Sequence, residues 1–570
     1  MAFQISPGVN VSEVDLTTVV PSTLTTAGAF VGTFQWGPAE KIKLIDSEIT
    51  LTKTFGKPNT DSAPSFFTSA GFLAYGNNLQ VIRAVGSAAL NAGDLDTVVI
   101  KNEDVYEETY LNSDNSNAYG AFVSRYPGSL GNSIKVEVFD SANNTLFNAW
   151  SYKSYFTSVP GTSDQADLAG GSNDEMHIVV VDTTGLVSGS AGTVLETYPF
   201  ISKASDGTMN GMSTYWKQVI FNNSKYIYVM DAVSYANTNS TWGSDSSTTF
   251  ARIPSGAGYY PNGFYSKTMA DGADDTPTDG DLENGYSLFS NKESVDISLV
   301  LTGDASVGVQ QYVIDNVASS RKDCVAFISP PSSAVINQSG DETTNIQTWL
   351  TSLARSSSFV VADSGWKYQL DKYNNVYRWV PLNGDVAGLC VYTDAIKDPW
   401  FSPAGFNRGA IKNAIKLAWN PSKTYRDTLY AAGVNPVVSF QGQGIVLFGD
   451  KTLQSKPSAF DRINVRRLFI TLEKSIATAA QYSLFELNDE FTRAQFVSLV
   501  TPFLRDIQGR RGITDFKVVC DSTNNTPNVI DSNQFVGDIY IKPARSINFI
   551  QLNFVAVATG VDFNTIVGVA

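Results

Sequence analysis

One histidine, three cysteines and many carboxylates are the residues whose chemistry could support catalysis or metal binding in this chain of 570 residues. His177 is the only histidine, so serine and cysteine triads and histidine-based metal sites are nearly excluded. Cys324, Cys390 and Cys520 are odd in number and widely spaced, which predicts buried thiols and not a disulfide framework or a zinc site. We therefore expect His177 to be structural, and we assign no catalytic or metal-binding residue.

The densest group of carboxylates lies between Gly272 and Gly285, in the segment GADDTPTDGDLENG. The acidic residues are Asp274, Asp275, Asp279, Asp281 and Glu283. Their spacing does not match an EF-hand loop, so the segment is interpreted as a mobile, solvated loop. A glycosidase needs only carboxylates, and an enzyme is therefore disfavoured, not disproved.

No segment has the spacing of a phosphate-binding loop, a dinucleotide fingerprint or a nucleophile elbow. Gly442, Gly444 and Gly449 are spaced for a tight turn beside a strand. We expect a protein that is not an enzyme and uses no cofactor.

Length and composition indicate several domains with sizeable cores. A chain of this length predicts two to four domains, and a hydrophobic content of 43% is enough to fill them. The charged fraction of 17% fits a surface largely covered by neighbours. No apolar run reaches about 18 residues, and the N-terminus lacks the features of a signal peptide. We expect the protein to fold in the cytoplasm, to insert in no membrane and to stay soluble until it assembles.

The net charge of −15 is distributed unevenly. Residues 86–320 contain 10 Lys and Arg against 28 Asp and Glu, a net of −18, whereas residues 401–570 contain 18 against 13, a net of +5. So acidic a chain is not expected to bind nucleic acid. The basic C-terminal third suits an acidic protein surface, although uneven scatter across domains is an alternative explanation.

Apolar patterning predicts a mixed α/β fold. The N-terminal part reads as a strand within Thr25–Trp36, a helix that Ser62 caps and a strand at Leu79–Val85. Short β-type runs then dominate up to Pro199, and a βαβ rhythm follows up to Val325. Later segments are predicted as a hairpin at Trp366–Val380, helices at 345–355, 385–397 and 463–482, and a helix at 489–507 capped by Asn488.

Three β-type segments crowd the C-terminal end. Phe516–Cys520 and Phe535–Ile541 are short apolar runs, and Ile550, Leu552 and Phe554 alternate with polar residues. Strands near a chain end offer unpaired backbone groups to another chain. This pattern indicates a protein that polymerises.

Several motifs in a fixed order resemble the contractile tail sheath proteins of bacteriophages. The resemblance covers roughly the first 85 residues and the stretch from about Gly384 to the end. The motifs are SPGVNVSEVD (6–15), FVGTFQWGP (30–38), DPWFSPAGFNRG (398–409), NPVVSFQGQGIVLFG (435–449), GRRGI (509–513), NNTP (524–527) and DIYIKPARSINFI (538–550).

The resemblance implies a multidomain α/β (α+β) fold built around a discontinuous inner domain. We expect that domain to comprise residues 21–85 and 326–545, between an N-terminal arm (1–20) and a C-terminal strand and arm (546–570). An outward-facing β-barrel or sandwich (86–199) and an α/β domain (200–325) are expected as insertions.

The resemblance also implies a function and a set of partners. Sheath subunits form stacked hexameric rings around a tail tube, and a metastable extended state contracts to drive the tube through the host envelope. The implied partners are other copies of this chain, the tail tube protein, and baseplate and tail terminator proteins. The implied location is the virion, after assembly in the host cytoplasm.

Two kinds of site follow from the resemblance. The first is a set of strands exchanged between subunits, carried onto Val9, Val11, Val14, Ile550, Leu552, Phe554, Val561 and Val567. Either the region after Ser546 is itself the donated arm, or Ile550, Leu552 and Phe554 form the receiving edge and the tail at 561–569 is the donor. The strands could instead pair within their own subunit. The second is a tube-facing basic cluster of Arg462, Arg466, Arg467, Arg505, Arg510, Arg511 and Lys542. Its alternative is a set of intradomain salt bridges with Asp461, Asp506 and Asp515.

Two other functions remain open at this point. A sheath from a phage-derived injection machine fits the same motifs. A carbohydrate-binding or carbohydrate-degrading tail component is suggested by the aromatic residues of the middle region, which are Tyr215, Trp216, Trp242, Tyr259, Tyr260 and Tyr265.

Overall fold

The computed structural model describes residues 20, 24–112, 119–233, 241–253, 263–548 and 550–552. The chain divides into two compact units. The larger unit comprises Pro21–Pro399 and Pro403–Ala477, and the smaller comprises Met1–Val20, Trp400–Ser402 and Thr478–Ala570. Helix α14 (Ile463–Ala480) begins in the larger unit and ends in the smaller. The predicted mixed α/β, multidomain fold is confirmed.

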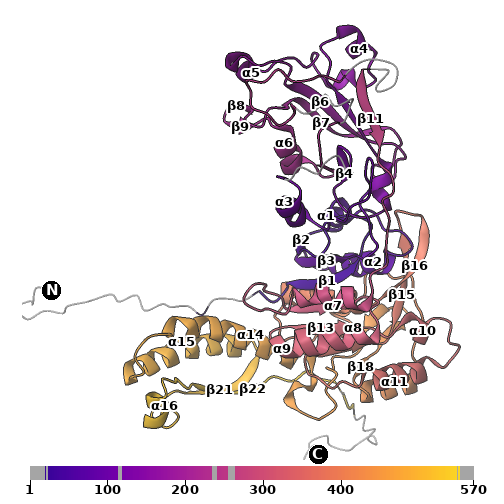
Figure 1. Cartoon of the computed structure of the whole chain (residues 1–570). Helices are drawn as coiled ribbons and strands as arrows, with labels where there is room; N and C mark the ends of the chain where they lie inside the picture. The colour runs from indigo at the N-terminus through magenta and orange to yellow at the C-terminus, as the bar shows by residue number, and fades with distance from the viewer. Residues whose placement is uncertain are drawn as a thin grey trace, which may run out of the picture. The chain divides into compact units, whose positions relative to one another are not determined.

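A seven-stranded sheet forms the centre of the larger unit (Figure 1). All neighbouring strands are parallel except the pair β2–β3. In spatial order the strands are β18 (Val434–Asn435), β14 (Val360–Asp363), β13 (Val325–Ile328), β12 (Leu299–Leu301), β1 (Gly28–Thr33), β3 (Leu79–Ala84) and β2 (Lys43–Ile45). These segments are short and rich in Val, Ile and Leu, as expected for strands covered on both faces.

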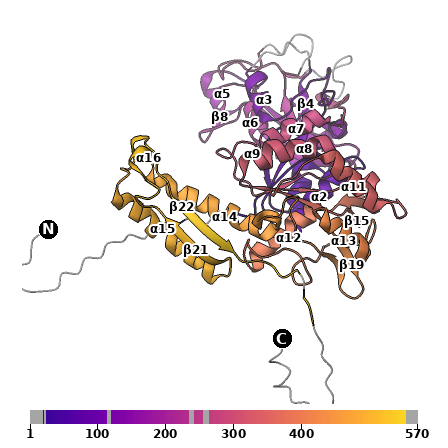
Figure 2. The same cartoon turned by 90° about the horizontal axis from the view of Figure 1, so that it is seen from below.

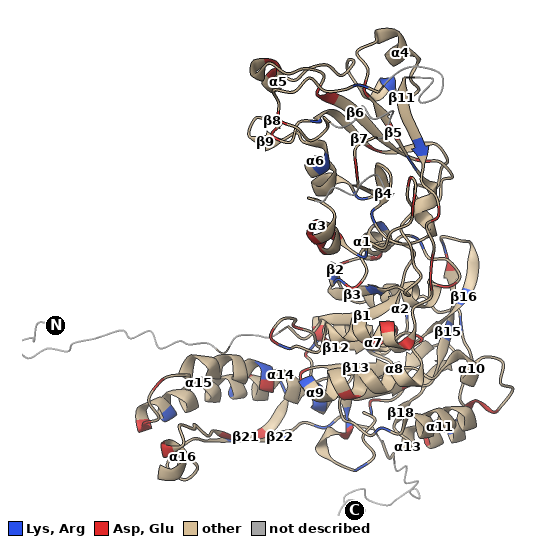
Figure 3. Ribbon diagram, in the orientation of Figure 1, with Lys and Arg blue, Asp and Glu red and all other residues tan. Residues whose placement is uncertain are grey.

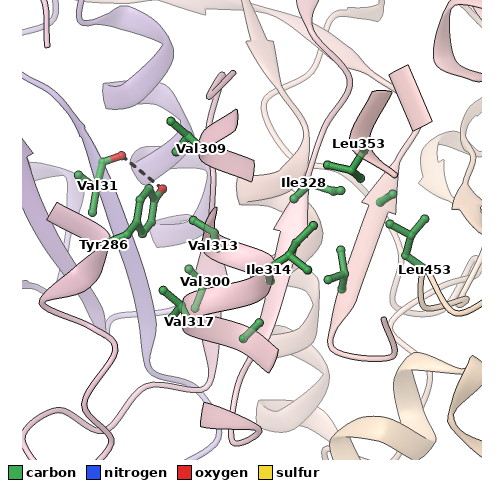
Figure 4. Packing of buried hydrophobic residues seen from close by; sticks show 14 of the residues in the cluster. Val31, Tyr286, Val300, Val309, Val313, Ile314, Val317, Ile328, Leu353 and Leu453 are labelled. Atoms are coloured by element: carbon green, nitrogen blue, oxygen red, sulfur yellow. Dashed lines mark hydrogen bonds between the residues drawn. The ribbon is translucent and has the colours of Figure 1, made fainter. Parts of the chain in front are cut away.

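Helices cover both faces of this sheet. Because successive side chains of a strand point to opposite faces, Ala29 and Val31 of β1 enter one core and Phe30 enters the other. The first core is completed by α7 (Asp279–Ser287), α8 (Val307–Tyr312) with its continuation through α9 (Ser319–Arg321), and α11 (Glu342–Leu353). Figure 4 shows Tyr286 of α7 in this core, with its hydroxyl turned towards the carbonyl of Val31.

The second core lies on the opposite face of the sheet. Its helices are α1 (Glu48–Phe55), α2 (Ala63–Leu73), α12 (Asn383–Ile396) and the start of α14. The ring of Phe72 lies directly against Gly28, where a Cβ atom would be 2.7 Å from the ring. A side chain at position 28 would therefore collide with the packing of α2 on β1.

The region inserted after β3 has its own four-stranded antiparallel sheet. The strands lie in the order β11 (Phe264–Thr268), β5 (Ile134–Phe139), β6 (Glu175–Asp182) and β7 (Thr193–Ser202). Two smaller pairs accompany it, β4 (Phe122–Ser124) with β10 (Ile227–Val229), and β8 (Thr208–Met209) with β9 (Met212–Ser213). The helices of this region are α3 (Glu103–Thr109), α4 (Asn144–Ala149), α5 (Asp164–Ala169) and α6 (Trp216–Asn223).

The expected α/β insertion at residues 200–325 does not form a separate unit. β10 and β11 pair with β4 and β5, so residues up to about Thr268 complete the β-rich region that begins before Pro199. β12 pairs with β1 and β13, and α7 and α8 pack on the central sheet. The βαβ pattern recognised near Ile297–Ile328 is present, but its strands β12 and β13 belong to the central parallel sheet, in which β12 lies between β1 and β13.

The rest of the larger unit consists mostly of hairpins and short helices. The hairpin predicted at Trp366–Val380 is confirmed as β15 (Trp366–Asp371) and β16 (Val376–Pro381), with β17 (Lys416–Leu417) beside β15. A second hairpin, β19 (Val437–Phe440) and β20 (Gly444–Leu447), turns at Gly442 and Gly444, both with positive φ, as predicted for these glycines. α10 (Ser332–Val335) and α13 (Lys423–Ala431) complete the unit.

The smaller unit packs one long helix on a two-stranded antiparallel ribbon. The helix α15 (Glu490–Gly509) lies along β21 (Ile513–Val519) and β22 (Asp538–Pro543), and α16 (Pro527–Asp531) lies between the strands in sequence (Figure 2). The side chains that α15 buries are Phe496, Val500, Leu504 and Ile507. The apolar stripe predicted for this helix and the two predicted strands are present.

Three local predictions are corrected. Ser62 makes no side-chain cap at α2 and instead bonds to Asn59, and Asp489, not Asn488, caps α15 through a 2.8 Å bond from the Thr492 N–H. The expected mobile loop at 272–285 contains the first turns of α7, which begins in a capping box between Thr278 and Asp281. The acidic residues there complete a helix terminus, a role that their spacing alone did not indicate.

Candidate assembly surfaces

The β21–β22 ribbon of the smaller unit has two open edges. Among the described residues these strands pair only with each other, so each presents one row of backbone N–H and C=O groups without a strand partner. A two-stranded sheet is marginal by itself, and an uncovered edge is a template for another strand. The ribbon can therefore accept a strand on either side.

The two faces of the ribbon differ. Phe516 lies opposite Ile541 and Val518 opposite Ile539, all four partly buried and on the same face. On the other face Lys542 lies opposite Asp515, and its Nζ donates to the Asp515 carboxylate at 2.9 Å. One face is therefore apolar, and the other is charged and exposed.

Side-chain amides of the NNTP motif close the ribbon. Asn525 is buried, donates from Nδ2 to the Val536 carbonyl at 2.8 Å and accepts the Val536 N–H at 2.9 Å. Asn524 donates to the carbonyl of Val519 and to the carboxylate of Asp538. The Asn525 side chain thus bonds to both backbone groups of Val536, as a neighbouring strand would, just before β22 begins. The sequence motif pointed to this segment, but the residue types alone did not identify the role of Asn525.

The GRRGI motif forms the turn between α15 and β21. Arg510 lies 5.0 Å from the ring centroid of Trp400 and pairs with Asp506 at 3.4 Å. Arg511 has a φ of 67°, and a side chain at Gly512 would meet both Ile507 and Trp400. The motif therefore sets the path of the chain into β21, and Trp400 of the DPWFSP motif provides the surface on which it turns.

Arg467 anchors the segment that leads into β1, at Thr25. Its guanidinium makes two bonds of 2.8 and 2.6 Å to the Asp394 carboxylate, which also accepts from the Thr25 hydroxyl at 2.7 Å. Burial by itself lowers the pKa of Arg467. The adjacent Asp394 carboxylate raises the pKa by more than burial lowers it, so the net shift is upward. This ion pair, buried on both sides, ties Thr25 to α12 and α14.

Arg466 is a second buried arginine. Its guanidinium lies 4.2 Å from the ring of Phe359 and 4.0 Å from that of Phe460, and it donates to the Ser358 hydroxyl at 2.9 Å. Burial lowers its pKa to about 10. This side chain is a packing element in the larger unit.

The structure therefore separates the predicted basic cluster. Arg466 and Arg467 are buried and cannot offer exposed ion pairs to a tube, and Arg462 pairs with Asp450 at 3.9 Å. Arg505, Arg510, Arg511 and Lys542 are exposed in the smaller unit, two of them paired with Asp506 and Asp515 as the alternative predicted. Helical periodicity could have shown that Arg466 and Arg467 follow the apolar stripe of α14.

Most of the predicted arm residues lie outside the described residues. These are Val9, Val11, Val14, Phe554, Val561 and Val567. Ile550 and Leu552 are described, are 78% and 70% exposed, and carry no strand assignment. They do not form the edge of a sheet in the described chain, so within the described part of the smaller unit the open edges are those of β21 and β22.

The described aromatic residues of the middle region, Tyr215, Trp216, Trp242 and Tyr265, pack in or against the core of the inserted sheet. Trp216 and Tyr265 are buried in the core of the inserted sheet, and Trp242 packs edge-on against Trp216. Tyr259 and Tyr260 lie outside the described residues. The packing explains these aromatics as core residues.

His177 has the structural role predicted for it. The ring stacks on Phe156 at 4.3 Å, accepts the Phe200 N–H at Nδ1 (3.1 Å) and so donates from Nε2 to the Ser158 carbonyl (2.9 Å). Burial lowers its pKa. Cys324, Cys390 and Cys520 are free and buried, as predicted.

Within the described ranges, no group of three or more His, Cys, Asp or Glu residues is arranged to hold a metal ion. Among those same residues, no helix is long and apolar enough to cross a membrane.

Three family models match the chain in order. The tail sheath protein Gp18 domain III N-terminal region matches residues 25–84, the phage tail sheath protein central domain matches 293–453, and the phage tail sheath C-terminal domain matches 455–556. The interval between the first two matches, 85–292, corresponds closely to the inserted β-rich region.

Curated relatives align with nearly the full chain. The tail sheath protein of Vibrio phage KVP40 is 36% identical over 99% of this chain and 100% of its own length. The tail sheath protein of Enterobacteria phage T4 is 34% identical over 99% of both chains.

Solved sheath structures share the fold. The sheath of an extracellular contractile injection system, in its contracted state, matches with a TM-score of 0.51 and 12% identity over 99% of this chain and 100% of its own. A sheath tail protein of Listeria innocua matches with a TM-score of 0.52 and 11% identity over 93% and 97% of the two chains. The chain belongs to the phage tail sheath protein family and is a subunit of a contractile sheath.

Proposed function

We propose that copies of this chain stack as six-subunit rings around a tail tube and remain linked by exchanged strands while the sheath shortens. The observation that carries the proposal is the β21–β22 ribbon, whose two edges are open in a protein of a sheath family. The donors are the terminal segments at either end of the chain. No nucleotide is required, because the free energy of contraction is stored when the extended sheath assembles.

Strand exchange suits a link that must survive contraction. A strand added to a ribbon edge forms about four to six backbone hydrogen bonds, each contributing about 0.5–1.5 kcal/mol, and buries alternate side chains. Several kcal/mol per link, on a flexible connection, tolerates rotation of the compact units.

The donated side chains are Val9, Val11 and Val14 at the N-terminal end and Val561 and Val567 at the C-terminal end, with Phe554 leading into the second arm. Asn10 and Ser12 alternate with Val9 and Val11, so an added strand would place Val9 and Val11 on one face. That face matches the apolar face of the ribbon formed by Phe516 and Ile541.

Contacts with the tube must instead release together. Exposed ion pairs contribute about 0.2–1 kcal/mol each and are screened by salt, so many weak pairs in parallel fit this requirement. We assign this surface to Arg505, Arg510, Arg511 and Lys542, the members of the basic cluster that are exposed. Other partners are baseplate and tail terminator proteins, and assembly takes place in the host cytoplasm before incorporation into the virion.

Deletion of residues 1–15 tests the proposal. We expect a folded monomer that forms single rings or short stacks and no long sheaths, because one donated strand is lost at every junction. Negative-stain electron microscopy gives the length distribution, and circular dichroism confirms the fold.

A matched pair of variants separates the arm from general charge effects. Val9→Asp with Val11→Asp places charge on the valine face, and Asn10→Asp with Ser12→Asp places the same charge on the opposite face. The first pair should shorten sheaths far more than the second. Long, regular sheaths from the 1–15 deletion would defeat the proposal.

A further inference from the structure

The loop between α14 and α15 exposes an unusual concentration of large apolar side chains. Within ten residues, Tyr482, Leu484, Phe485, Leu487 and Phe491 are between 63% and 105% exposed. Single exposed apolar side chains are common, whereas a cluster of this size on a surface marks a contact with another molecule. We call these five residues the apolar knob.

The knob is held in a defined shape. Leu484 N–H donates to the Gln481 carbonyl, Asp489 caps α15, and Asn488 donates to the Gln534 carbonyl at 2.7 Å. Phe485 has a φ of 69°, in the left-handed region of backbone conformation that residues other than glycine rarely adopt. A strained, fully exposed phenylalanine at the tip of an ordered loop is consistent with a contact that the isolated subunit does not make.

Acidic side chains surround the knob. Glu486, Asp489 and Glu490 are all exposed and lie within the same ten residues, at the start of α15 (Figure 3). The complementary surface would therefore be an apolar groove with a basic rim.

The larger unit contains such a groove. It lies between the end of α2, strand β15 and the loop at 411–415, and it has a volume of about 500 Å³. Its apolar lining includes Phe67, Leu73, Leu370, Ile411 and Ile415, of which Leu370 and Ile415 are exposed.

One polar atom of the groove wall also lacks a partner. Gln369, which is 6% exposed, lines the groove, and its Oε1 is buried without a hydrogen-bond partner in the part of the chain that the structure describes. A buried acceptor of this kind is costly unless an occupant brings a donor. The knob carries such a donor in the hydroxyl of Tyr482.

The rim of the groove is basic. Lys372 lines it, paired with Glu48 at 3.0 Å, and Lys412 and Lys416 flank it with exposed side chains. Lys412 lies 4.6 Å from the ring of Tyr75 and Lys416 lies 4.9 Å from that of Tyr368, so both stems are fixed against aromatic rings. Three lysines against one glutamate complement the three carboxylates around the knob.

We propose that the apolar knob of one copy docks in the groove at Leu370 and Ile415 of a neighbouring copy. The two surfaces differ, so the contact is heterologous, and a heterologous contact that does not close on itself propagates a helical polymer. The inference rests on the proposed sheath function and adds a side-chain contact that is independent of strand exchange. Apolar burial gives this contact its strength, and the opposed charges fix its register.

Cysteine cross-linking between separately prepared copies tests the contact. Phe485→Cys is introduced in one preparation and Ile415→Cys in another, and the native thiols do not interfere because all three are buried. A short bismaleimide should link the two variants in mixed sheaths and link neither variant alone. The control pair is Leu168→Cys with Ile415→Cys, since Leu168 is equally apolar and 89% exposed but lies on α5.

Each result of the cross-linking experiment decides one question. Normal sheaths without the Phe485–Ile415 product would overturn the knob proposal and leave the sheath function standing. A product within isolated monomers of the double variant would also overturn it, because the knob would then occupy its own groove. Wild-type protein that forms no sheaths would remove the proposed function, and the knob contact with it.

Charge exchange provides a second measurement. Glu486→Lys with Glu490→Lys should raise the protein concentration needed for assembly on the order of tenfold or more, because like charges then meet across the contact. Lys412→Glu with Lys416→Glu should do the same, and the two altered proteins mixed together should assemble better than either alone. An absence of rescue in the mixture, with both variants folded, would contradict the pairing of these surfaces.

Discussion

The central sheet of the larger unit and the ribbon of the smaller unit use β-structure in opposite ways. The seven strands of the sheet come from segments spread along the chain between Gly28 and Asn435. Four of them, β1, β12, β13 and β14, are buried along nearly their whole length. The ribbon has two strands, one covered face and two open edges. The sheet is therefore covered on both faces within one subunit, whereas the ribbon is the surface to which we assign strand exchange.

This difference follows from the composition of the strands. Strands β12, β13 and β14 read LVL, VAFI and VVAD, which suits burial on both faces. Strand β22 reads DIYIKP, with alternating partly buried and exposed residues, which suits a surface that is half covered. Under the proposed strand exchange, the sheet preserves the fold of each subunit and the ribbon receives strands from other copies.

The largest effect is expected when the complete core is broken. Phe72→Ala removes a fully buried ring between α2 and Gly28 and should lower the free energy of unfolding by about 3–5 kcal/mol. Tyr540→Ala, on the exposed face of β22, should change it by no more than about 0.5 kcal/mol and should shorten sheaths. Chemical denaturation measures the first quantity and electron microscopy the second.

The comparison between core and ribbon fails if the two variants behave alike. A strong loss of monomer stability in Tyr540→Ala would mean that the ribbon is stabilised within its own subunit and is not open. Normal stability in Phe72→Ala would mean that the sheet tolerates a cavity beside β1.

A smaller effect is expected at the buried ion pair that holds Thr25. Asp394→Asn leaves the guanidinium of Arg467 in a buried site without its counter-charge, which should cost on the order of 3 kcal/mol. The bond from the Thr25 hydroxyl is altered as well, so residues before Thr25 should become more sensitive to limited proteolysis. Thermal unfolding and protease digestion measure the two effects.

A matched variant tests whether burial causes this cost. Asp515→Asn removes the partner of Lys542 in an exposed ion pair that solvent screens, and its effect on stability should be far smaller than that of Asp394→Asn. Equal effects at Asp394 and Asp515 would contradict the assignment of Arg467 as a buried anchor.

Local patterns predicted the elements well and their neighbours less well. The hairpins at β15–β16 and β19–β20, the stripe of α15 and both ribbon strands follow from residue types that act within a few positions, such as the positive φ of Gly442. The partner of β12 could not be read in this way. Its three residues, LVL, fit any buried parallel strand, and only packing of α7 and α8 selects the edge of β1.

The candidate site shows the same limit. Charge alone grouped Arg466 and Arg467 with Arg510 and Lys542, although the first two lie on the buried side of α14. A basic residue next to an apolar stripe can be a stacked or ion-paired core residue. Deciding between these needs its partners, and two of them, Phe359 and Asp394, are far away in sequence. The apolar knob was also missed, because large apolar residues in a short loop are usually assumed to be buried.

The inserted sheet offers the smallest effect and a direct test of how closed its core is. His177 is neutral in a buried site between Phe156 and Phe200, and burial lowers its pKa from the usual 6.5. The unfolded chain therefore takes up a proton at higher pH than the folded protein. The stability that His177 contributes is complete above about pH 6.5 and is lost as the pH falls towards the lowered pKa, by about 1.4 kcal/mol for each unit of pKa difference.

Because His177 is the only histidine, one ring resonance reports the titration in the intact protein. A midpoint clearly below 6.5 is expected, together with a fall in the free energy of unfolding between pH 6.5 and that midpoint. Protonation would oppose the Phe200 N–H with a second donor at Nδ1, and so the core must resist it. A midpoint at or above 6.5 would show that water or an acidic group reaches the ring. The core of the inserted sheet around His177 would then be accessible to solvent.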